Sequence, residues 1–412
     1  MRMLEGNSGD IRYLLSTQAI RDRAKKIHEL CQAGETSFSI DESRLDFVAQ
    51  VTVDVTRKNY PDLNVPFHSR WRHFDVGSVP RVAKLHQLLS RGEAREAIRA
   101  QLDLVIVSVL LDAGAGMAWR FREQSTGNVY SKSEGLAVAA FEMFLAGLFS
   151  SNLNQPLRVD SEGLKKLEFK TFTDCFQVTD QNPLVGCRGR FELLKKLGQV
   201  LESQREYFGS SPARPGFLFD FLQQKSKSQG NALRATDILS AVQASLSEIW
   251  PGKIGVNRFN LGDAWIYPPL GSGLEAVVPF HKLSQWLTYS MVDPLLSAGL
   301  KIEGFEEMTA LAEYRNGGVL LDGGVLKLRD PSNSLRSHPP SSELIVEWRA
   351  LTVVLMEKVA ERVRIHLRKS AQDLPLGKVL EGGTWWAGRL LAREKRPDGG
   401  SPLNIESDGT VF

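Results

Sequence analysis

Apolar residues recur along most of this chain at the spacing of an amphipathic helix. Between residues 81 and 111, for example, Ile98, Leu102 and Val105 fall on one wide apolar face, and Gly92 divides the stretch into two segments. The pattern indicates a mainly α-helical protein with a few short strands. Comparable spacing predicts further helices over residues 11–34, 42–58, 131–149, 189–207, 217–225, 235–249 and 341–368, and from residue 278 onward.

Residues that favour helix ends support three of these boundaries. Ser131 and Glu134 form a capping box, in which the serine caps the helix and the glutamate reaches back to it. Ser341 or Ser342 precedes the long helix that ends near residue 368. Pro279 suits the first turn of the helix that opens near residue 278.

The C-terminal part carries two further signals. A last helix is expected to follow the glycine-rich stretch 380–384, and its N-terminus could bind an anion. The final residues, 403–412, are typical of a short strand-like tail with a turn at Asp408–Gly409.

Composition narrows the class of protein. The chain has 412 residues, of which 42% are hydrophobic and 24% charged, as in a soluble globular protein. Its formal net charge of +3 gives no reason to expect a nucleic-acid partner, which would need a clustered basic face. Three cysteines, Cys31, Cys175 and Cys187, lack metal-type spacing, so we expect buried or partly buried thiols in a reducing compartment and no structural zinc. The sequence shows no metal-ligand constellation, and we expect neither a metal nor an organic cofactor.

No shift of composition marks a domain boundary, so we expect one large helical unit over 1–412. A soft subdivision into 1–155, 156–275 and 276–412 separates an N-terminal part, a middle insertion and a C-terminal part. The polar N-terminus does not resemble a signal peptide, and the longest apolar run, 102–111, is far shorter than the roughly 20 residues that span a bilayer. We therefore expect a cytoplasmic protein without a membrane partner.

The densest candidate chemistry lies in residues 312–324. Glu313, Tyr314, Arg315 and Asp322 surround a short apolar run between two glycine pairs. Paired glycines permit tight turns and the close approach of a ligand, and charged groups beside such a turn are poorly explained by packing alone. The stretch is therefore our first hypothesis for a substrate site.

A second candidate is the basic and aromatic cluster HSRWRHF at 68–74. Two arginines and two histidines beside Trp71 could hold an anion, because a guanidinium offers a fork of donors that matches phosphate. The same composition also fits a surface loop whose arginines pair with carboxylates. The sequence leaves these two interpretations equally open.

The stretch VLLDAGAG, which ends at Gly116, also has two interpretations. Helical spacing continues from Ile98 into this stretch, so Gly114 suits a helix C-terminus. The letters also resemble the first motif of Rossmann-type methyltransferases, although Trp119 stands where the dinucleotide fingerprint has its third glycine.

Three polar groups later in the chain could wall a site. Asp263 and Trp265 lie in a polar-aromatic loop, where the aspartate could equally form a turn. Around residues 281–289, a stripe of histidine, glutamine and tyrosine follows helical spacing. Glu347 flanks the apolar face of the long helix, so it must be paired, most simply with an arginine, or functional.

Several stretches together resemble the fungal and bacterial uracil-catabolism family long filed as a domain of unknown function. The resemblance runs from about residue 10 to the last residue. It rests on HSRWRHF (68–74), LDAGAG (111–116), SEGLAV (133–138), PLRVD (156–160), VPFHKLSQWLTYS (278–290), EYRNGG (313–318), SELIVEWRAL (342–351), LEGGTW (380–385) and SDGTVF (407–412).

A shorter segment, LAEYR at 311–315, is similar to the Phe-Ala-Asp-Tyr-Arg segment of the queuosine-salvage N-glycosidases. Their fold is akin to the helical DNA glycosylases, so the resemblance implies a core of the helix-hairpin-helix type. This chain has Glu313 where that family has aspartate, and Asn-Gly-Gly where it has Val-Pro-Gln.

The two resemblances imply a hydrolase that cuts the N-glycosidic bond between ribose and urea in ribosylurea or its 5'-phosphate. Such a reaction needs a carboxylate beside an oxocarbenium-like ribose, for which Glu313 is the first choice. The rival hypotheses are a Rossmann-type enzyme that uses residues 112–116 and a non-catalytic pathway partner. The residues expected at the site are Glu313, Asp322 and Asp112 as catalytic groups, and His68, Arg70, Trp71, Arg72, Trp119, Asp263, Trp265, His281, Lys282, Gln285, Trp286, Tyr289, Tyr314, Arg315 and Glu347 as substrate-binding groups.

Overall fold

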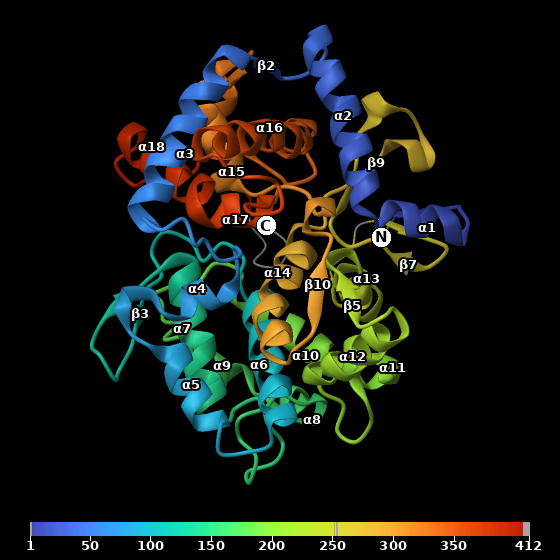
Figure 1. Cartoon of the computed structure of the whole chain (residues 1–412), viewed down its shortest axis with the longest axis vertical. Coiled ribbons are helices and arrows are strands. Elements are labelled where there is room, and N and C mark those ends of the chain that lie inside the picture. Colours follow the sequence, from blue (N-terminus) through green and yellow to red (C-terminus); the bar gives the residue numbers. More distant parts are fainter. Residues whose placement is uncertain (1, 251, 253, 407–412) are drawn as a thin grey trace. The chain divides into compact units, whose positions relative to one another are not determined.

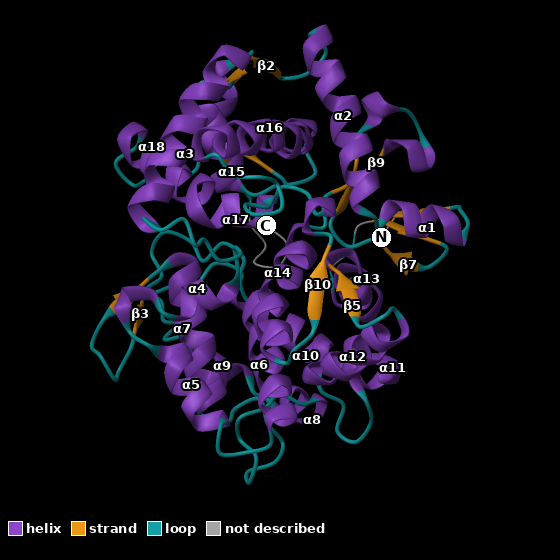
Figure 2. Cartoon of the chain, viewed as in Figure 1, coloured by secondary structure: helices purple, strands orange, loops and turns teal. Residues whose placement is uncertain are grey.

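The computed structural model describes residues 2–250, 252 and 254–406. Helices make up most of this part of the chain, and the strands are two or three residues long (Figure 2). The mainly α-helical fold predicted from the periodicity is therefore confirmed. The helix-hairpin-helix arrangement implied by resemblance stays a prediction.

The chain forms two compact units that interleave along the sequence (Figure 1). Unit 1 contains Met1–His68, Gly252–Gln285 and Gly304–Glu406, and unit 2 contains Ser69–Pro251 and Trp286–Glu303. One helix, α14 (Lys282–Ser297), begins in unit 1 and ends in unit 2.

Unit 1 is built around the long helix α16 (Glu343–Leu367), which packs against α2, α3 and α15. The hydroxyl of Ser342 accepts from Ile345 N and caps α16, as predicted. Leu344, Leu351 and Val359 are among the buried residues on this helix. The other helices of unit 1 are α1 (Ser8–Leu14), α2 (Thr17–Ala33), α3 (Leu45–Asn59), α15 (Tyr314–Asp322), α17 (Leu376–Val379) and α18 (Trp385–Lys395).

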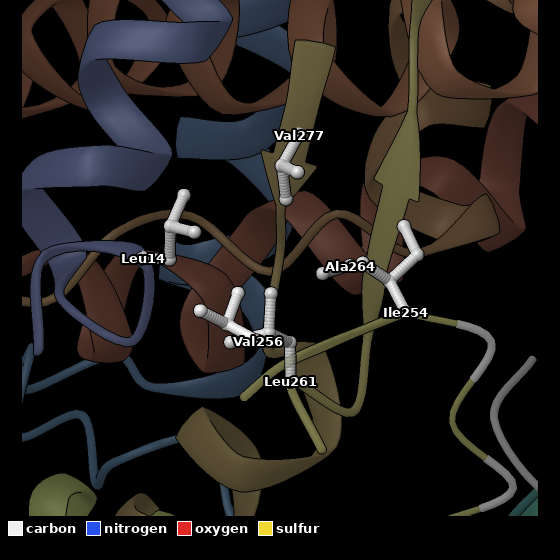
Figure 3. Close-up of a cluster of buried hydrophobic side chains, with 6 residues drawn as sticks. All are labelled: Leu14, Ile254, Val256, Leu261, Ala264 and Val277. Carbon is white, nitrogen blue, oxygen red and sulfur yellow. The ribbon is translucent and has the colours of Figure 1, made fainter. Parts of the chain in front are cut away.

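Short strands join distant segments of unit 1. β6 pairs with β1 in parallel and with β7 in antiparallel, β8 pairs with β9 and β2 with β11 in antiparallel, and β12 pairs with β13 in parallel. Figure 3 shows Leu14, the last residue of α1, beside side chains of β6, β8 and β9, which form one buried apolar cluster. The strands are β1 (Arg2–Leu4), β2 (Phe38–Ile40), β6 (Ile254–Val256), β7 (Phe259–Asn260), β8 (Ala264–Ile266), β9 (Val277–Pro279), β11 (Leu326–Leu328), β12 (Ser337–His338) and β13 (Asn404–Ile405).

Unit 2 has α6 (Ala94–Leu110) at its centre. Every residue of α6 from Ala100 to Leu110 is buried, and the helix packs against α4, α5, α7, α10 and α12. β3 (Phe121–Arg122) pairs with β4 (Val129–Tyr130) in antiparallel, and β5 (Ala232–Arg234) pairs with β10 (Lys301–Glu303) in parallel. The remaining helices are α4 (Arg70–Phe74), α5 (Arg81–Leu89), α7 (Lys132–Leu145), α8 (Ser161–Lys166), α9 (Phe169–Cys175), α10 (Cys187–Ser203), α11 (Arg205–Phe208), α12 (Leu218–Ser228) and α13 (Ala235–Leu246).

Several predicted boundaries were wrong for local reasons. The helix expected over 11–34 is two helices, because the hydroxyl of Ser16 accepts from Ala19 N and starts α2. Pro279 ends strand β9 and lies before α14, not inside its first turn. Ser131 precedes α7 as expected, but its side chain makes no capping hydrogen bond.

The structure tests some of the C-terminal predictions, and one of them falls on residues that it does not describe. Gly382 and Gly383 do not open a helix, because α17, a single π-helical turn (Leu380–Thr384) and α18 follow one another without a break. Asn404 and Ile405 form the short strand expected there, whereas the turn at Asp408–Gly409 lies outside the described residues. No helix among the described residues is long and apolar enough to cross a membrane.

Candidate functional site

Glu313 is the N-cap of α15. Its Oε2 accepts from Arg315 N at 2.7 Å, and its Oε1 accepts from Asn316 N at 2.6 Å. Two backbone donors therefore fix the carboxylate at the positive end of the helix dipole. The 313–318 stretch is the start of a helix and not the open turn that its glycines had suggested.

The charge state of Glu313 reflects opposing influences. Desolvation raises the pKa of this half-buried carboxyl, and the N–H groups of Arg315 and Asn316 lower it. The ammonium of Lys282, the first residue of α14, also lowers it. Glu313 and Lys282, predicted independently, thus lie close enough to interact electrostatically.

The glycine pair after Glu313 serves close packing. Gly317 lies within α15, where a Cβ atom would come within 2.7 Å of Trp348 Cε2 and 2.9 Å of Thr352 Oγ1 on α16. Trp348 Nε1 also donates to Gly317 O at 3.1 Å. The glycine therefore lets α15 approach α16, and positive φ is not its role.

A buried ion pair supports the segment before Glu313. Arg349, on α16, donates from Nη1 and Nη2 to the two carboxylate oxygens of Asp263 at 2.8 and 2.7 Å. Its Nε donates to Ala312 O at 3.1 Å. One guanidinium thus ties the Asp263 loop to the residue that precedes the proposed catalytic carboxylate.

Asp263 is itself fully committed to such contacts. Trp265 Nε1 donates to Oδ1 at 2.8 Å, and Lys282 N donates to Oδ2 at 3.0 Å. Burial raises the pKa of this carboxyl, but the Arg349 guanidinium and these donors outweigh it and hold the pKa well below the usual range. Asp263 is therefore an ionised carboxylate that holds the start of α14. It lies in a loop, as predicted from the sequence.

The polar residues expected to form one stripe at 281–289 bind different groups in the structure. His281 is buried and has a φ of +48°, and its Nε2 lies 2.8 Å from Leu14 O. A carbonyl only accepts, so Nε2 carries a proton and donates; burial lowers the pKa of the ring. Gln285 is bound to Thr309, donating to its hydroxyl at 2.8 Å and accepting from its N–H at 3.0 Å.

The simplest hypothesis for Glu347 was that it pairs with an arginine, but its partners are a tyrosine hydroxyl and a backbone N–H group. Its Oε1 accepts from Tyr267 OH and its Oε2 from Ser37 N, both at 2.8 Å. Desolvation raises the pKa of this buried carboxyl, and the two donors oppose the rise. Burial, and after it the same contact with Glu347, raises the pKa of Tyr267.

Three further predicted residues of unit 1, Arg315, Asp322 and His68, each contact other groups of that unit. Arg315 donates from Nη1 to Gly399 O at 2.9 Å, and its guanidinium lies over the ring of Tyr314 at 4.8 Å. Asp322, at the other end of the helix, accepts two hydrogen bonds from Arg396 at 2.7 and 2.6 Å. His68 Nδ1 lies 2.7 Å from Glu381 Oε2.

Unit 2 holds a polar cluster around Arg70. The fully buried guanidinium donates from Nε to Ser108 Oγ at 2.8 Å and from Nη1 to Asp112 Oδ1 at 2.7 Å. Ser133 Oγ donates to Asp112 Oδ1 at 2.6 Å and lies 2.9 Å from His73 Nδ1. The basic cluster at 68–74 therefore contains a buried arginine that is paired with a carboxylate.

The other predicted residues of unit 2 each have their own contacts within that unit. Trp286 lies 5.6 Å from the Arg70 guanidinium, and Trp71 Nε1 donates to Ser290 O at 2.7 Å. Arg72 pairs with Asp293 at 2.8 Å. Trp119 is buried and donates from Nε1 to Phe176 O at 2.9 Å. Tyr289 is fully buried on α14.

The Rossmann interpretation of residues 112–116 is wrong. The loop follows helix α6 instead of a strand, and Arg190 donates to the carbonyl oxygens of Leu111, Ala113 and Gly114 at 3.0, 2.8 and 2.9 Å. A dinucleotide loop presents N–H groups to phosphate after a parallel strand. Here an arginine binds the carbonyls that end a helix.

Sequence reasoning did not single out Arg349, Glu381 or Asn316 as site residues. Arg349 stands two positions after Glu347, and its partner lies 86 residues away along the chain. Such contacts depend on tertiary packing, which single-sequence periodicity does not reveal. Among the described residues, no three His, Cys, Asp or Glu side chains form a metal-binding group.

Comparisons with known proteins give a family-level result. Residues 13–412 match the family described as "Protein of unknown function (DUF1688)". The chain is 41% identical over 411 residues to "Protein urg3" of Schizosaccharomyces pombe, covering 97% of this chain and 98% of that protein. It is 35% identical over 437 residues to "Uracil catabolism protein 4" of Lachancea kluyveri, covering 98% and 99%.

Proposed function

The chain belongs to the family described as protein of unknown function (DUF1688), and from this premise we propose that it is an N-glycosidase of uracil catabolism. It would hydrolyse the bond between ribose and urea in ribosylurea or its 5'-phosphate. The similarity to a protein named for uracil catabolism supports the pathway. The reaction rests on the chemistry of unit 1.

The observation that carries this proposal is the fixed carboxylate of Glu313. Hydrolysis of an N-riboside develops positive charge on the sugar, which a rigid carboxylate stabilises best because its orientation is set before the reaction. Each Glu313 oxygen accepts one backbone hydrogen bond, and a carboxylate has about four acceptor sites. The remaining lone pairs are available to ribose or to the attacking water.

The neighbouring groups have supporting roles in this proposal. Lys282 favours the ionised form of Glu313 and is suited to meet a 5'-phosphate. Arg349 and Asp263 hold the backbone on both sides, at Ala312 and at Lys282. Tyr314, half-buried beside the Arg315 guanidinium, is suited to contact ribose hydroxyls.

The test is direct. Purified protein is incubated with ribosylurea and, separately, with its 5'-phosphate, and free urea is measured; uridine serves as a control riboside with a different leaving group. We expect urea from at least one of the two ureides. A non-catalytic pathway partner would release urea from neither, and that result would overturn the proposal.

A further inference from the structure

A second titratable pair lies buried in unit 1, outside the Glu313 contacts. His68 and Glu381 are each only 5% exposed, and His68 Nδ1 lies 2.7 Å from Glu381 Oε2. Tyr60 OH donates to the other carboxylate oxygen, Oε1, at 3.1 Å. A carboxylate at Nδ1 fixes the tautomer of a histidine and makes Nε2 the atom that exchanges a proton.

The backbone holds both members of this pair in place. Glu381 stands in the π-helical turn Leu380–Thr384, a form that is rare and is frequent at functional sites. Gly383 lets this turn lie against α3, since a Cβ there would come within 2.3 Å of Thr52 Cγ2. The backbone N–H of His68 donates to Gly377 O on α17 at 2.9 Å.

The same turn is bonded to the start of α15. Thr384 Oγ1 donates to Asn316 Oδ1 at 2.9 Å, and Asn316 N donates to Glu313 Oε1 at 2.6 Å. Thr384 and Glu381 are three residues apart. A short chain of hydrogen bonds therefore connects the segment that carries Glu381 with the Glu313 carboxylate.

We propose that His68, oriented by Glu381 and Tyr60, is the general acid that protonates the urea leaving group in the reaction proposed above. The inference rests on that function. The C1'–N bond breaks and its electron pair goes to the urea nitrogen, which takes the proton from His68 Nε2. Water then adds to C1' and gives its proton to Glu313. A proton returned through solvent from Glu313 to His68 completes the cycle, so atoms and charge balance.

In this proposal His68 donates a proton to the leaving group, and Glu313 accepts a proton from water. Urea is a poor leaving group as an anion, so its departure depends on protonation, and a general acid contributes about 10²–10⁴-fold to such a step. Glu381 and Tyr60 are positioning residues in this scheme. Charged groups on the neighbouring segments include Lys378, which lies over the ring of Phe67 at 5.4 Å, and Arg389, which lies over the ring of Trp385 at 4.6 Å.

The test compares two leaving groups in the full-length protein. With ribosylurea, His68→Gln should lower kcat by about 100-fold or more, because the leaving nitrogen needs a proton. With p-nitrophenyl ribofuranoside, whose phenolate leaves unprotonated, the loss should stay below about 10-fold. His86→Gln, which removes a histidine of unit 2 bound to Gln101, is the matched control and should behave as the unaltered protein.

Equal losses of His68→Gln on both substrates, or no loss on ribosylurea, would overturn the inference. Glu381→Gln provides a second readout, because it removes the carboxylate that orients the His68 ring. Its loss of kcat should also be larger with ribosylurea than with p-nitrophenyl ribofuranoside. Equal losses on the two substrates would contradict the pairing. Urea release by the unaltered protein tests the function itself, so the two failures are distinguishable.

Discussion

Arg349 donates to both carboxylate oxygens of Asp263, at 2.8 and 2.7 Å, and its Nε donates to Ala312 O at 3.1 Å. Asp263 in turn accepts from the backbone of Lys282 at 3.0 Å. One ion pair thus holds the residue before Glu313 and the first residue of α14. The positions of Glu313 and Lys282 therefore depend on the Arg349–Asp263 ion pair, although neither member of the pair has a role in the proposed reaction.

Breaking this pair should destabilise the protein strongly. Asp263→Asn removes the charge that the buried Arg349 guanidinium binds, and we expect a loss of about 3–5 kcal/mol. The double variant Asp263→Leu/Arg349→Met should cost less than the sum of the single variants, because no charge is left unpaired. Equilibrium denaturation of the unaltered protein, Asp263→Leu, Arg349→Met and the double variant checks this, and strictly additive losses would contradict it.

Asp263 should also give stability a defined pH dependence. Its pKa is lower in the folded than in the unfolded protein, so its contribution is complete above about pH 4 and is lost as pH falls through the folded value. The stability difference from Asp263→Asn should therefore shrink by about 1.4 kcal/mol per pH unit below pH 4. A difference that is constant between pH 7 and pH 3 would be inconsistent with this assignment.

The two glycines of α15 should differ sharply in their tolerance of a methyl group. Gly317→Ala places its Cβ 2.7 Å from Trp348 Cε2, and we expect a loss of about 1–3 kcal/mol. Gly318→Ala meets nothing closer than Pro402 Cδ at 3.4 Å and gains helix propensity, so it should be neutral or stabilising by up to about 1 kcal/mol. Thermal denaturation of both variants checks the pair, and similar melting temperatures would argue against the packing role.

Lys282 should set the acidic limb of activity. Desolvation raises the pKa of Glu313 and the Lys282 ammonium opposes that rise, so Lys282→Met should raise the pKa further. The ionised form of Glu313 would then appear at higher pH, and the acidic limb of kcat/KM should move upward. A profile of the variant that superimposes on the unaltered one would remove Lys282 from the site.

Local signals predicted much of the fold. Helical periodicity identified α5, α6, α7, α10 and α12, and Ser342 identified the start of α16, because these signals depend on residues close in sequence. Pro279 misled because proline suits a strand end as well as a first helical turn. The glycines at 382–383 misled because close packing against α3 requires the same residue type as an open helix start.

The sequence predicted only part of the candidate site, because some of its contacts join residues far apart in the chain. Glu313, Lys282 and Asp263 carry recognisable chemistry, and the structure places them in one connected part of unit 1. Arg349 and Glu381 lie in stretches that carry the family resemblance, but nothing in the sequence indicates which side chains they bind. Their partners, Asp263 and His68, are 86 and 313 residues away, so only tertiary structure reveals them.

The most direct test of the central claim is the rate of urea release from ribosylurea by Glu313→Gln. Asp160→Asn is the matched control, because Asp160 is a fully buried acidic N-cap that accepts from Gly163 N at 2.8 Å in unit 2. Each variant should lose about 0.3–1 kcal/mol of stability, because it removes a negative charge at a helix N-terminus. We predict that Glu313→Gln lowers kcat/KM by at least about 100-fold while Asp160→Asn leaves it unchanged. An equal rate in both variants, or no urea from the unaltered protein, would contradict the account.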